Sequence, residues 1–146
     1  MAVQPRCSVF SPVRRLNTFN LDYHFFYQLC DGAPANLRKE LGLLTSAEFK
    51  ITSLCQDIGN DEAAEFQATV DAMTLFGWSP AFQNFIFRTC AAILHMGQIV
   101  FEENEKKQCM EVSEDTQASA EMAAKLLNVS TESLVKVLTA TKISAG

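Results

Sequence analysis

The sequence has few of the residue patterns by which enzymes are recognised. Its 146 residues contain no G-x-x-x-x-G-K-[ST] phosphate loop, and the six glycines are dispersed along the chain. His24 and His95 lack cysteine or carboxylate partners at metal-ligand spacing, so both are predicted to lie at the edge of the core. Cys90 and His95 fall on different faces of one predicted helix, which argues against a nucleophile–base pair. The residues alone therefore predict no catalytic, cofactor-binding or metal-binding residue.

Disulfides, zinc sites and membrane spans have no support in the sequence either. The five cysteines are an odd number, scattered without a C-x-x-C pair: Cys7, Cys30, Cys55, Cys90 and Cys109. This pattern predicts reduced thiols in a cytoplasmic protein. The net charge of −5 argues against non-specific binding to nucleic acid or to an anionic membrane. No apolar run reaches the roughly 18 residues of a membrane span, because Gln83, Asn84 and Arg88 interrupt the most apolar helix.

Acidic side chains are missing from residues 1–20, which carry Arg6, Arg14 and Arg15. A basic and acid-poor start is typical of a mitochondrial presequence. The alternative is a poorly structured end, because prolines at positions 5 and 12 interrupt any long amphipathic helix. We prefer the second interpretation and expect one helical domain over residues 21–146.

The sequence is rich in helical periodicity. Hydrophobic residues make up 48% and charged residues 20%, with eleven phenylalanines, which is typical of a globular domain with a packed core. Apolar spacing predicts a mainly α fold of about six helices, over residues 21–30, 36–41, 61–76, 79–98, 117–128 and 131–140. One or two short strands are expected, the first within residues 98–102, with a capping box at 45–48 and a solvated loop at 102–108. The predicted N-caps include Asn60, Ser79 and Ser130.

The predicted helix over residues 79–98 is apolar nearly all round, which is typical of a helix in the middle of a larger structure. One face at three- and four-residue spacing carries Phe82, Phe85, Ile86, Ile93 and Met96. Because the connection to the preceding helix is short, we expect Phe85 and Ile93 to pack against Phe66 and Met73 of that helix. The opposite side, with Phe87 and Leu94 and their neighbours in residues 21–30, is then expected to stay exposed and to cause self-association.

Four segments of the chain carry longer motifs. Residues 23–33 read Y-H-F-F-Y-Q-L-C-D-G-A, and residues 61–80 read D-E-A-A-E-F-Q-A-T-V-D-A-M-T-L-F-G-W-S-P. Residues 86–103 read I-F-R-T-C-A-A-I-L-H-M-G-Q-I-V-F-E-E, and residues 123–143 begin A-A-K-L-L-N-V. In this order and at this spacing they resemble the myosin motor domain. The family's matching runs include Y-H-I-F-Y-Q-L-L-x-G-A and I-F-R-I-L-A-A-I-L-H-L-G-N-I-x-F.

The resemblance implies a fragment of the larger α/β phosphate-loop motor fold, in the upper fifty-kilodalton region between switch I and switch II. For an intact family member it implies ATP and magnesium as cofactors, actin filaments as a partner, and a cytoplasmic, cytoskeleton-associated location. No matched position is an active-site residue of the family, so no catalytic, cofactor or metal residue is carried over. The chain alone is expected to bind no cofactor and to be inactive, although the family is an actin-activated ATPase.

The resemblance leaves two functional interpretations. The first is a scaffold segment of an actin-based, ATP-driven motor, whose partner is the remainder of a myosin motor domain. The second is a non-motor helical interaction module derived from a myosin. Neither interpretation gives the chain a nucleic-acid or membrane partner.

Overall fold

The computed structural model describes residues 23–53, 61–104 and 109–139. Within these ranges the fold is mainly α, with six α-helices and one two-stranded antiparallel sheet, which confirms the predicted fold class. The helices are α1 (His24–Tyr27), α2 (Ala35–Leu41), α3 (Glu62–Leu75), α4 (Pro80–Gln98), α5 (Gln117–Leu127) and α6 (Thr131–Thr139). A π-helical turn, η1 (Gln28–Gly32), continues α1, and a 3₁₀ turn, η2 (Glu114–Thr116), precedes α5.

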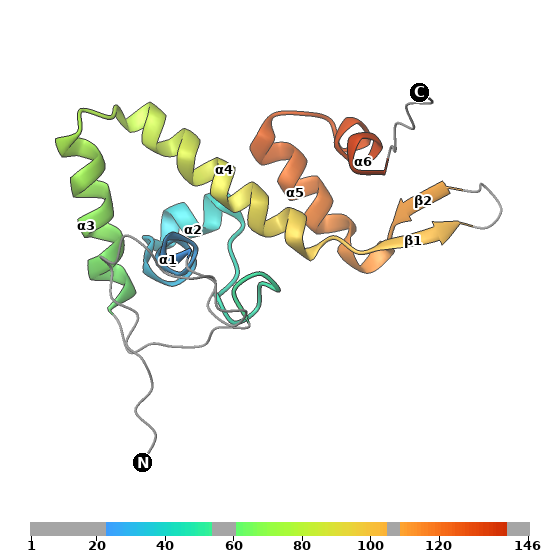
Figure 1. Cartoon of the computed structure of the whole chain (residues 1–146), viewed down its shortest axis with the longest axis horizontal. Helices are drawn as coiled ribbons and strands as arrows, with labels where there is room; N and C mark the ends of the chain where they lie inside the picture. Colours follow the sequence, from blue (N-terminus) through green and yellow to red (C-terminus); the bar gives the residue numbers. More distant parts are fainter. Residues whose placement is uncertain (1–22, 54–60, 105–108, 140–146) are drawn as a thin grey trace, which may run out of the picture.

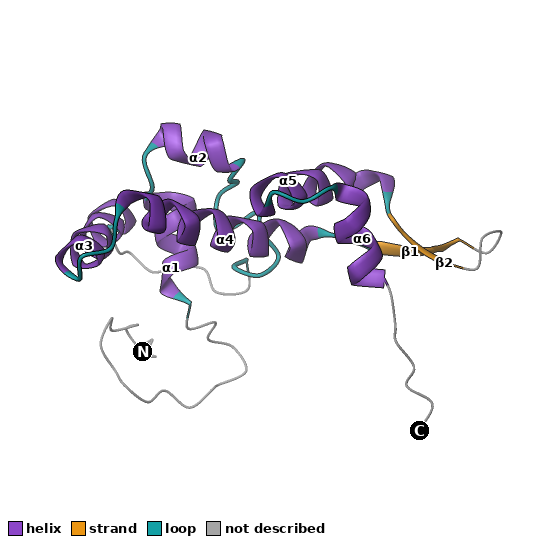
Figure 2. Cartoon of the chain, turned by 90° about the horizontal axis from the view of Figure 1, so that it is seen from above, coloured by secondary structure: helices purple, strands orange, loops and turns teal. Residues whose placement is uncertain are grey.

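Helix α4 is the axis of the molecule. It runs from α3 at one end to the hairpin of strands β1 (Phe101–Asn104) and β2 (Cys109–Val112) at the other (Figure 1). Helices α1 and α2 lie beside its middle, and α5 packs along its second half, followed by α6. The hairpin extends beyond the helices at the end opposite α3 (Figure 2). The arrangement is elongated, and several large apolar side chains of α4 are exposed, namely Phe82, Phe85 and Ile93.

The helix starts are set by short polar side chains. Ser79 Oγ accepts a hydrogen bond from the Phe82 N–H at 3.3 Å, and Pro80 occupies the first helical position of α4, as predicted. Ser130 Oγ accepts from the Ser133 N–H at 3.2 Å, which confirms the predicted cap of α6. The predicted cap of α3 is wrong by one residue. Asp61, rather than Asn60, accepts from the Ala64 N–H at 3.1 Å, and Asn60 lies outside the described residues.

The segment predicted as one helix over residues 21–30 is an α-helical turn that widens into the π-helical turn η1. Its end is held against the start of α3. A Cβ atom built on Gly32 would lie 2.0 Å from the Glu62 carbonyl oxygen, so only glycine permits this close approach. Leu29 and Cys30 are fully buried there, while Phe25 packs on the main cluster from its edge.

The predicted capping box at residues 45–48 is half formed. Glu48 Oε2 accepts hydrogen bonds from the Thr45 N–H at 2.9 Å and from the Thr45 hydroxyl at 2.7 Å. The residues form successive turns rather than a helix. The two bonds also lower the pKa of the Glu48 carboxyl, because both donors favour its charged form.

The strand prediction near residue 100 is wrong in its limits. Strand β1 begins at Phe101 and continues to Asn104, into the stretch predicted as a solvated loop. It pairs with β2, with Phe101 opposite Val112 and Glu103 opposite Met110. The sequence did not reveal β2 because its four residues are too few to show alternation of apolar and polar side chains. Residues 105–108 lie outside the described part of the chain.

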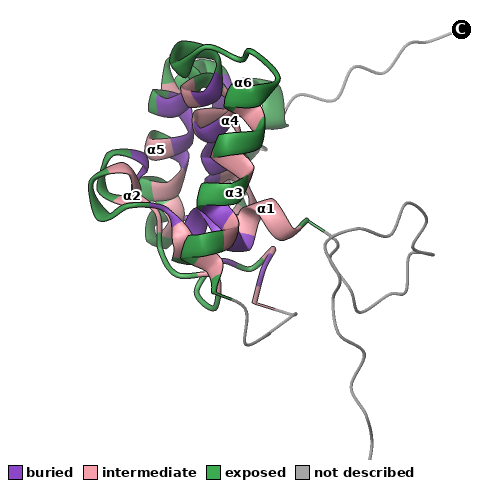
Figure 3. Ribbon diagram, turned by 90° about the vertical axis from the view of Figure 1, so that its left-hand side faces the viewer, coloured by how far each residue is buried: buried purple, intermediate pink, exposed green. Residues whose placement is uncertain are grey.

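The core lies on the side of α4 that was predicted to be exposed. Phe87 is 7% exposed and Leu94 is fully buried, whereas Phe85 is 62% exposed and Ile93 is 39% exposed. Phe66 of α3 contacts Phe87 rather than Phe85. Figure 3 shows the buried residues along the inner sides of the helices and the exposed residues on their outer turns. Both the predicted contact of Phe85 with Phe66 and the predicted exposed set are therefore wrong.

Small residues explain which side of α4 turned inward. Ala91 and Ala92 are fully buried, as are Ala120 and Ala123 of α5, so the two helix backbones can approach closely. Apolar spacing within α4 marks both sides equally, so it does not show which side packs against α5.

The candidate functional surface

His95 and Cys30 are the two buried residues of the helical core whose side chains could act as a base or a nucleophile, and burial disfavours the charged form of both. The His95 imidazole donates from Nε2 to the Leu41 carbonyl oxygen at 3.0 Å, and its ring meets the Phe49 ring edge-on with centroids 5.4 Å apart. Burial lowers the pKa of His95, because the charged imidazolium would lose its hydration. Burial likewise raises the pKa of the Cys30 thiol to about 12, with Asp31 adding to the effect. His95 is 5% exposed, so it lies inside the core rather than at the predicted edge.

The second thiol, that of Cys90, is free and half-buried, and burial raises its pKa as well. A reactive thiol needs a lowered pKa from a neighbouring cation or a helix start, and Cys90 has neither. Cys30 is also free, whereas Cys7 and Cys55 lie outside the described residues. Across residues 23–53, 61–104 and 109–139, no three His, Cys, Asp or Glu side chains are grouped so that they could hold a metal ion. In the same ranges, every helix is too short or too polar to cross a membrane.

Arg88 is the cation with the most specific geometry in the described chain. Its guanidinium donates from Nε to the Leu126 carbonyl oxygen at 3.3 Å, and from Nη2 to the carbonyl oxygens of Leu126 and Lys125 at 3.0 and 3.1 Å. These carbonyls belong to the last turn of α5, where the helix dipole is negative and the carbonyl groups lack partners within the helix. Arg88 therefore joins α4 to the end of α5, and its role is structural.

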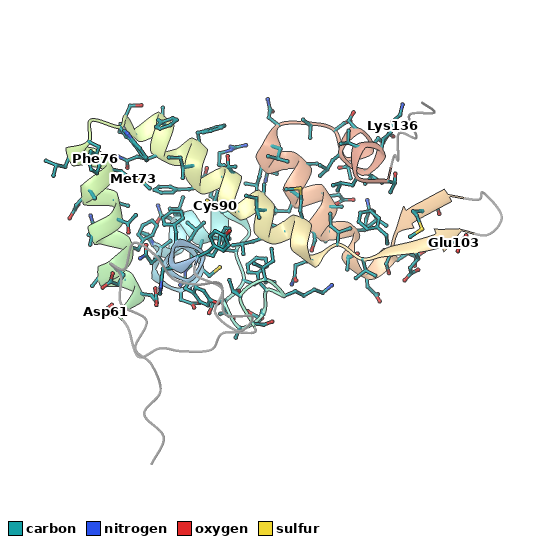
Figure 4. All side chains as sticks on the ribbon, in the orientation of Figure 1. Asp61, Met73, Phe76, Cys90, Glu103 and Lys136 are labelled. Atoms are coloured by element: carbon teal, nitrogen blue, oxygen red, sulfur yellow. The ribbon has the colours of Figure 1, made fainter. Side chains whose placement is uncertain are left out.

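The most unusual surface is an exposed apolar corner where α3 meets α4. We call it the aromatic corner and define it by Leu75, Phe76, Trp78, Phe82 and Phe85, which are 87%, 78%, 40%, 46% and 62% exposed. The rings form a chain: Trp78 meets Phe82 edge-on at 5.3 Å, and Phe82 stacks on Phe85 at 6.3 Å. Figure 4 places Phe76 at the end of α3 that leads into α4. Large apolar side chains gathered in this way mark a surface for contact with another molecule or segment.

A shallow groove continues the aromatic corner along α4. It encloses about 430 Å³ and is lined by Phe85, Arg88, Thr89, Leu126, Leu127 and Asn128. One wall is the exposed side of α4 and the other is the C-terminal turn of α5, which Arg88 holds in place. Its lining is apolar at Phe85 and Leu127 and polar at Arg88, Thr89 and Asn128.

The sequence predicted no site residue, and it also missed the aromatic corner. Phe82 and Phe85 fall at helical spacing, so they were assigned to the core. One signal could have found the corner. No charged residue occurs between Asp71 and Arg88, and Gln83 and Asn84 are the only polar residues of α4 before Arg88, so few polar side chains are available for its exposed side.

The described residues form a mainly α segment with an exposed apolar corner. The sequence profile of the myosin head (motor domain) matches residues 13–146, so the chain belongs to the myosin motor-domain family. The motifs at residues 23–33, 61–80 and 86–103 fall on α1 with η1, on α3, and on α4 with β1. The resemblance inferred from the sequence is thereby confirmed.

Named relatives agree with the family. The chain is 34% identical to Myosin-2 of Saccharomyces uvarum over 125 residues, which is 84% of this chain and 8% of the relative. It is 42% identical to Myosin-1 of Emericella nidulans over 87 residues, 58% of this chain and 7% of the relative. It is 33% identical to human unconventional myosin-XV over 121 residues, 81% of this chain and 3% of the relative. The chain therefore spans less than a tenth of the length of these relatives.

Proposed function

We propose that the chain is a scaffold segment of an actin-based, ATP-driven cytoskeletal motor, from the upper fifty-kilodalton region of its motor domain. The observation that carries this proposal is the match of the myosin head profile to residues 13–146. The remainder of the motor domain is the first partner of the segment. Actin filaments, and a cytoplasmic location with the cytoskeleton, follow from the family for the assembled motor.

Such a segment would contribute a set of packed helices that holds its shape within the motor. Helix α4 packs on α5 through fully buried alanines and on α3 through the aromatic cluster of Phe25, Phe66 and Phe87. Arg88 fixes the end of α5, and Gln83 bridges the turn that joins α3 to α4. Closely packed helices of this kind can transmit strain through the motor without taking part in the chemical reaction.

The proposal includes the absence of nucleotide chemistry from the chain by itself. Tight ATP binding needs an array of backbone N–H groups and a lysine around the phosphates, and the sequence contains no phosphate loop. Titration of the chain with MgATP in a calorimeter, together with a phosphate-release assay, tests this part. We expect no heat beyond dilution and no release above background. Micromolar ATP affinity would overturn this part of the proposal.

The aromatic corner favours the second candidate, a non-motor interaction module derived from a myosin. Its side chains remain exposed although the rest of the chain has formed a core. The full-length transcript separates the two candidates. A reading frame that continues into a phosphate loop on one side and switch II on the other supports the motor segment. A transcript that encodes only these 146 residues supports the module.

A further inference from the structure

We propose that residues 1–20 of this chain dock on the outer face of helix α3 within the same molecule. The outer face is defined by the exposed residues Ala64, Gln67, Ala68, Asp71, Ala72 and Leu75, with Glu65 at its edge. The inference goes beyond the scaffold role and does not rest on it. Three observations carry it: the exposure of this side of α3, the opposite charges of the two segments, and the place where the chain enters α1.

Helix α3 is packed on one side only. Phe66 is buried, and Val70 and Met73 pack against the larger core cluster from the same side of the helix. The opposite side carries exposed alanines at four-residue spacing, at positions 64, 68 and 72, and ends at Leu75, which is 87% exposed. Because alanine side chains are small, another segment can lie close to the helix backbone along this row.

The two segments carry charges of opposite sign. Residues 1–20 contain three arginines and no acidic residue. Residues 51–87 contain no lysine or arginine, and they contain five acidic residues: Asp57, Asp61, Glu62, Glu65 and Asp71. Helix α3 therefore offers no cation of its own to its carboxylates. It attracts the arginines of residues 1–20, whereas a second copy of α3 or any other acidic partner would be repelled.

The chain enters the described structure beside α3 (Figure 1). Phe25 stacks on Phe66 with ring centroids 6.5 Å apart, and the Gln28 side chain accepts a hydrogen bond from the Thr69 hydroxyl at 2.8 Å. Residue 20 precedes Phe25 by five residues, so the chain places it within about 18 Å of that contact. The 14 residues of α3 span about 21 Å, and a segment of twenty residues can reach along this whole length.

The covalent connection favours this segment over a separate partner. A short tether gives residues 1–20 an effective concentration in the millimolar range at α3, and docking does not cost the translational freedom of a second molecule. A contact too weak to hold two separate molecules together is then formed for a large part of the time. Because the attraction acts between exposed charges, salt should weaken it.

Nuclear magnetic resonance of the full chain, isotope-labelled at its alanine methyl groups, tests the proposal. We expect nuclear Overhauser effects from residues 9–19 to the methyl groups of Ala64, Ala68 and Ala72 at an ionic strength of about 0.01 M. At about 1 M their intensity should fall at least about twofold, because the screening length decreases from about 30 Å to about 3 Å. Isotope-filtered spectra of a mixture of labelled and unlabelled chains separate contacts within one chain from contacts between two chains.

A matched pair of charge variants identifies the face. Glu65→Gln/Asp71→Asn removes two carboxylates from α3 and should reduce the Overhauser effects at least about twofold at low ionic strength. The control Asp115→Asn/Glu121→Gln removes the same two groups from another acidic stretch without lysine or arginine, residues 108–124, and should leave them unchanged. Asp71 and Glu121 each accept a hydrogen bond from the glutamine four residues earlier, at 2.8 and 3.1 Å, so both variants lose a similar local contact.

Unchanged methyl resonances of the buried Ala91 and Ala123 show that each variant is folded. The absence of Overhauser effects between residues 1–20 and α3 in the unmodified chain at low ionic strength would overturn the proposal. So would a control variant that reduces them as much as Glu65→Gln/Asp71→Asn does. Contacts found only between labelled and unlabelled chains would make a second copy the occupant, and contacts with Phe82 and Phe85 in place of α3 would move the segment to the aromatic corner. Either result would also contradict the proposal.

Discussion

The rings of Phe66 and Phe87 lie with their centroids 5.6 Å apart and their planes inclined by 47°, and they join α3 to α4 at the centre of the larger core cluster. Phe85 lies two residues before Phe87 and is 62% exposed. Two phenylalanines only two residues apart are therefore in opposite environments. Phe87 lies on the buried side of α4, and Phe85 lies on the side that carries the aromatic corner.

Truncation of the two phenylalanines should therefore have very different effects on stability. Phe87→Ala opens a cavity beside Phe66 and Phe25 and should reduce the free energy of unfolding by about 3–5 kcal/mol. Phe85→Ala removes an exposed ring and should change it by less than about 0.5 kcal/mol. Urea denaturation followed by circular dichroism measures both. Equal losses for the two variants would show that the assignment of faces on α4 is wrong.

The bonds from Arg88 to the end of α5 predict a second stability effect. Arg88→Met keeps most of the aliphatic stem and removes the guanidinium. The Leu126 carbonyl then loses its Arg88 donors, and the Lys125 carbonyl keeps only the Asn128 N–H at 3.2 Å. Charge-assisted hydrogen bonds of this kind suggest a loss of about 1–3 kcal/mol in the free energy of unfolding. Arg88→Lys should recover only part of it, because an ammonium group cannot reach both carbonyls in a fork.

Lys136→Met serves as the control for loss of a positive charge, because Lys136 is exposed on α6. It should leave the denaturation midpoint unchanged. If Arg88→Met were no more destabilising than Lys136→Met, the guanidinium would contribute nothing to the attachment of α5.

The burial of His95 predicts how stability depends on pH. Its pKa is lowered in the folded chain, so below about pH 6.5 the unfolded chain binds a proton that the folded chain does not. Stability should therefore be greatest above pH 6.5 and should fall as the pH decreases from there toward the folded pKa. Denaturation midpoints at pH 7.5 and 5.5 measure the difference, and His95→Gln should reduce it. The same difference in both chains would contradict a neutral, buried imidazole.

Much of the fold could be predicted because local signals and tertiary packing agree. Ser79 with Pro80 starts α4, and Asn128, with a φ of 58°, ends α5 where the prediction ended it. The orientation of α4 could not be predicted, because apolar side chains occur on two faces. The side of α4 that is buried packs against the buried alanines of α5, and these residues are distant in sequence.

The aromatic corner could not be predicted for the same reason. Exposure depends on what the other helices leave uncovered, and apolar spacing within α4 does not show that. The one available signal was the absence of charged residues between Asp71 and Arg88, and it does not say which side chains are exposed. The domain boundary at residue 21 stays a prediction. The family profile begins at residue 13, and residues 1–22 lie outside the described structure.

The most direct test of the central claim is an exchange of segments. Residues 21–143 would replace the matching segment of a myosin motor domain with known actin-activated ATPase activity, and the chimera's ATPase rate would be measured with and without actin. If the chain is a scaffold segment of the motor fold, the chimera should keep actin activation within about tenfold of its parent, a change of at most ~1.4 kcal/mol in the activation barrier. A monodisperse chimera with the helical content of its parent and only background ATPase would contradict the claim.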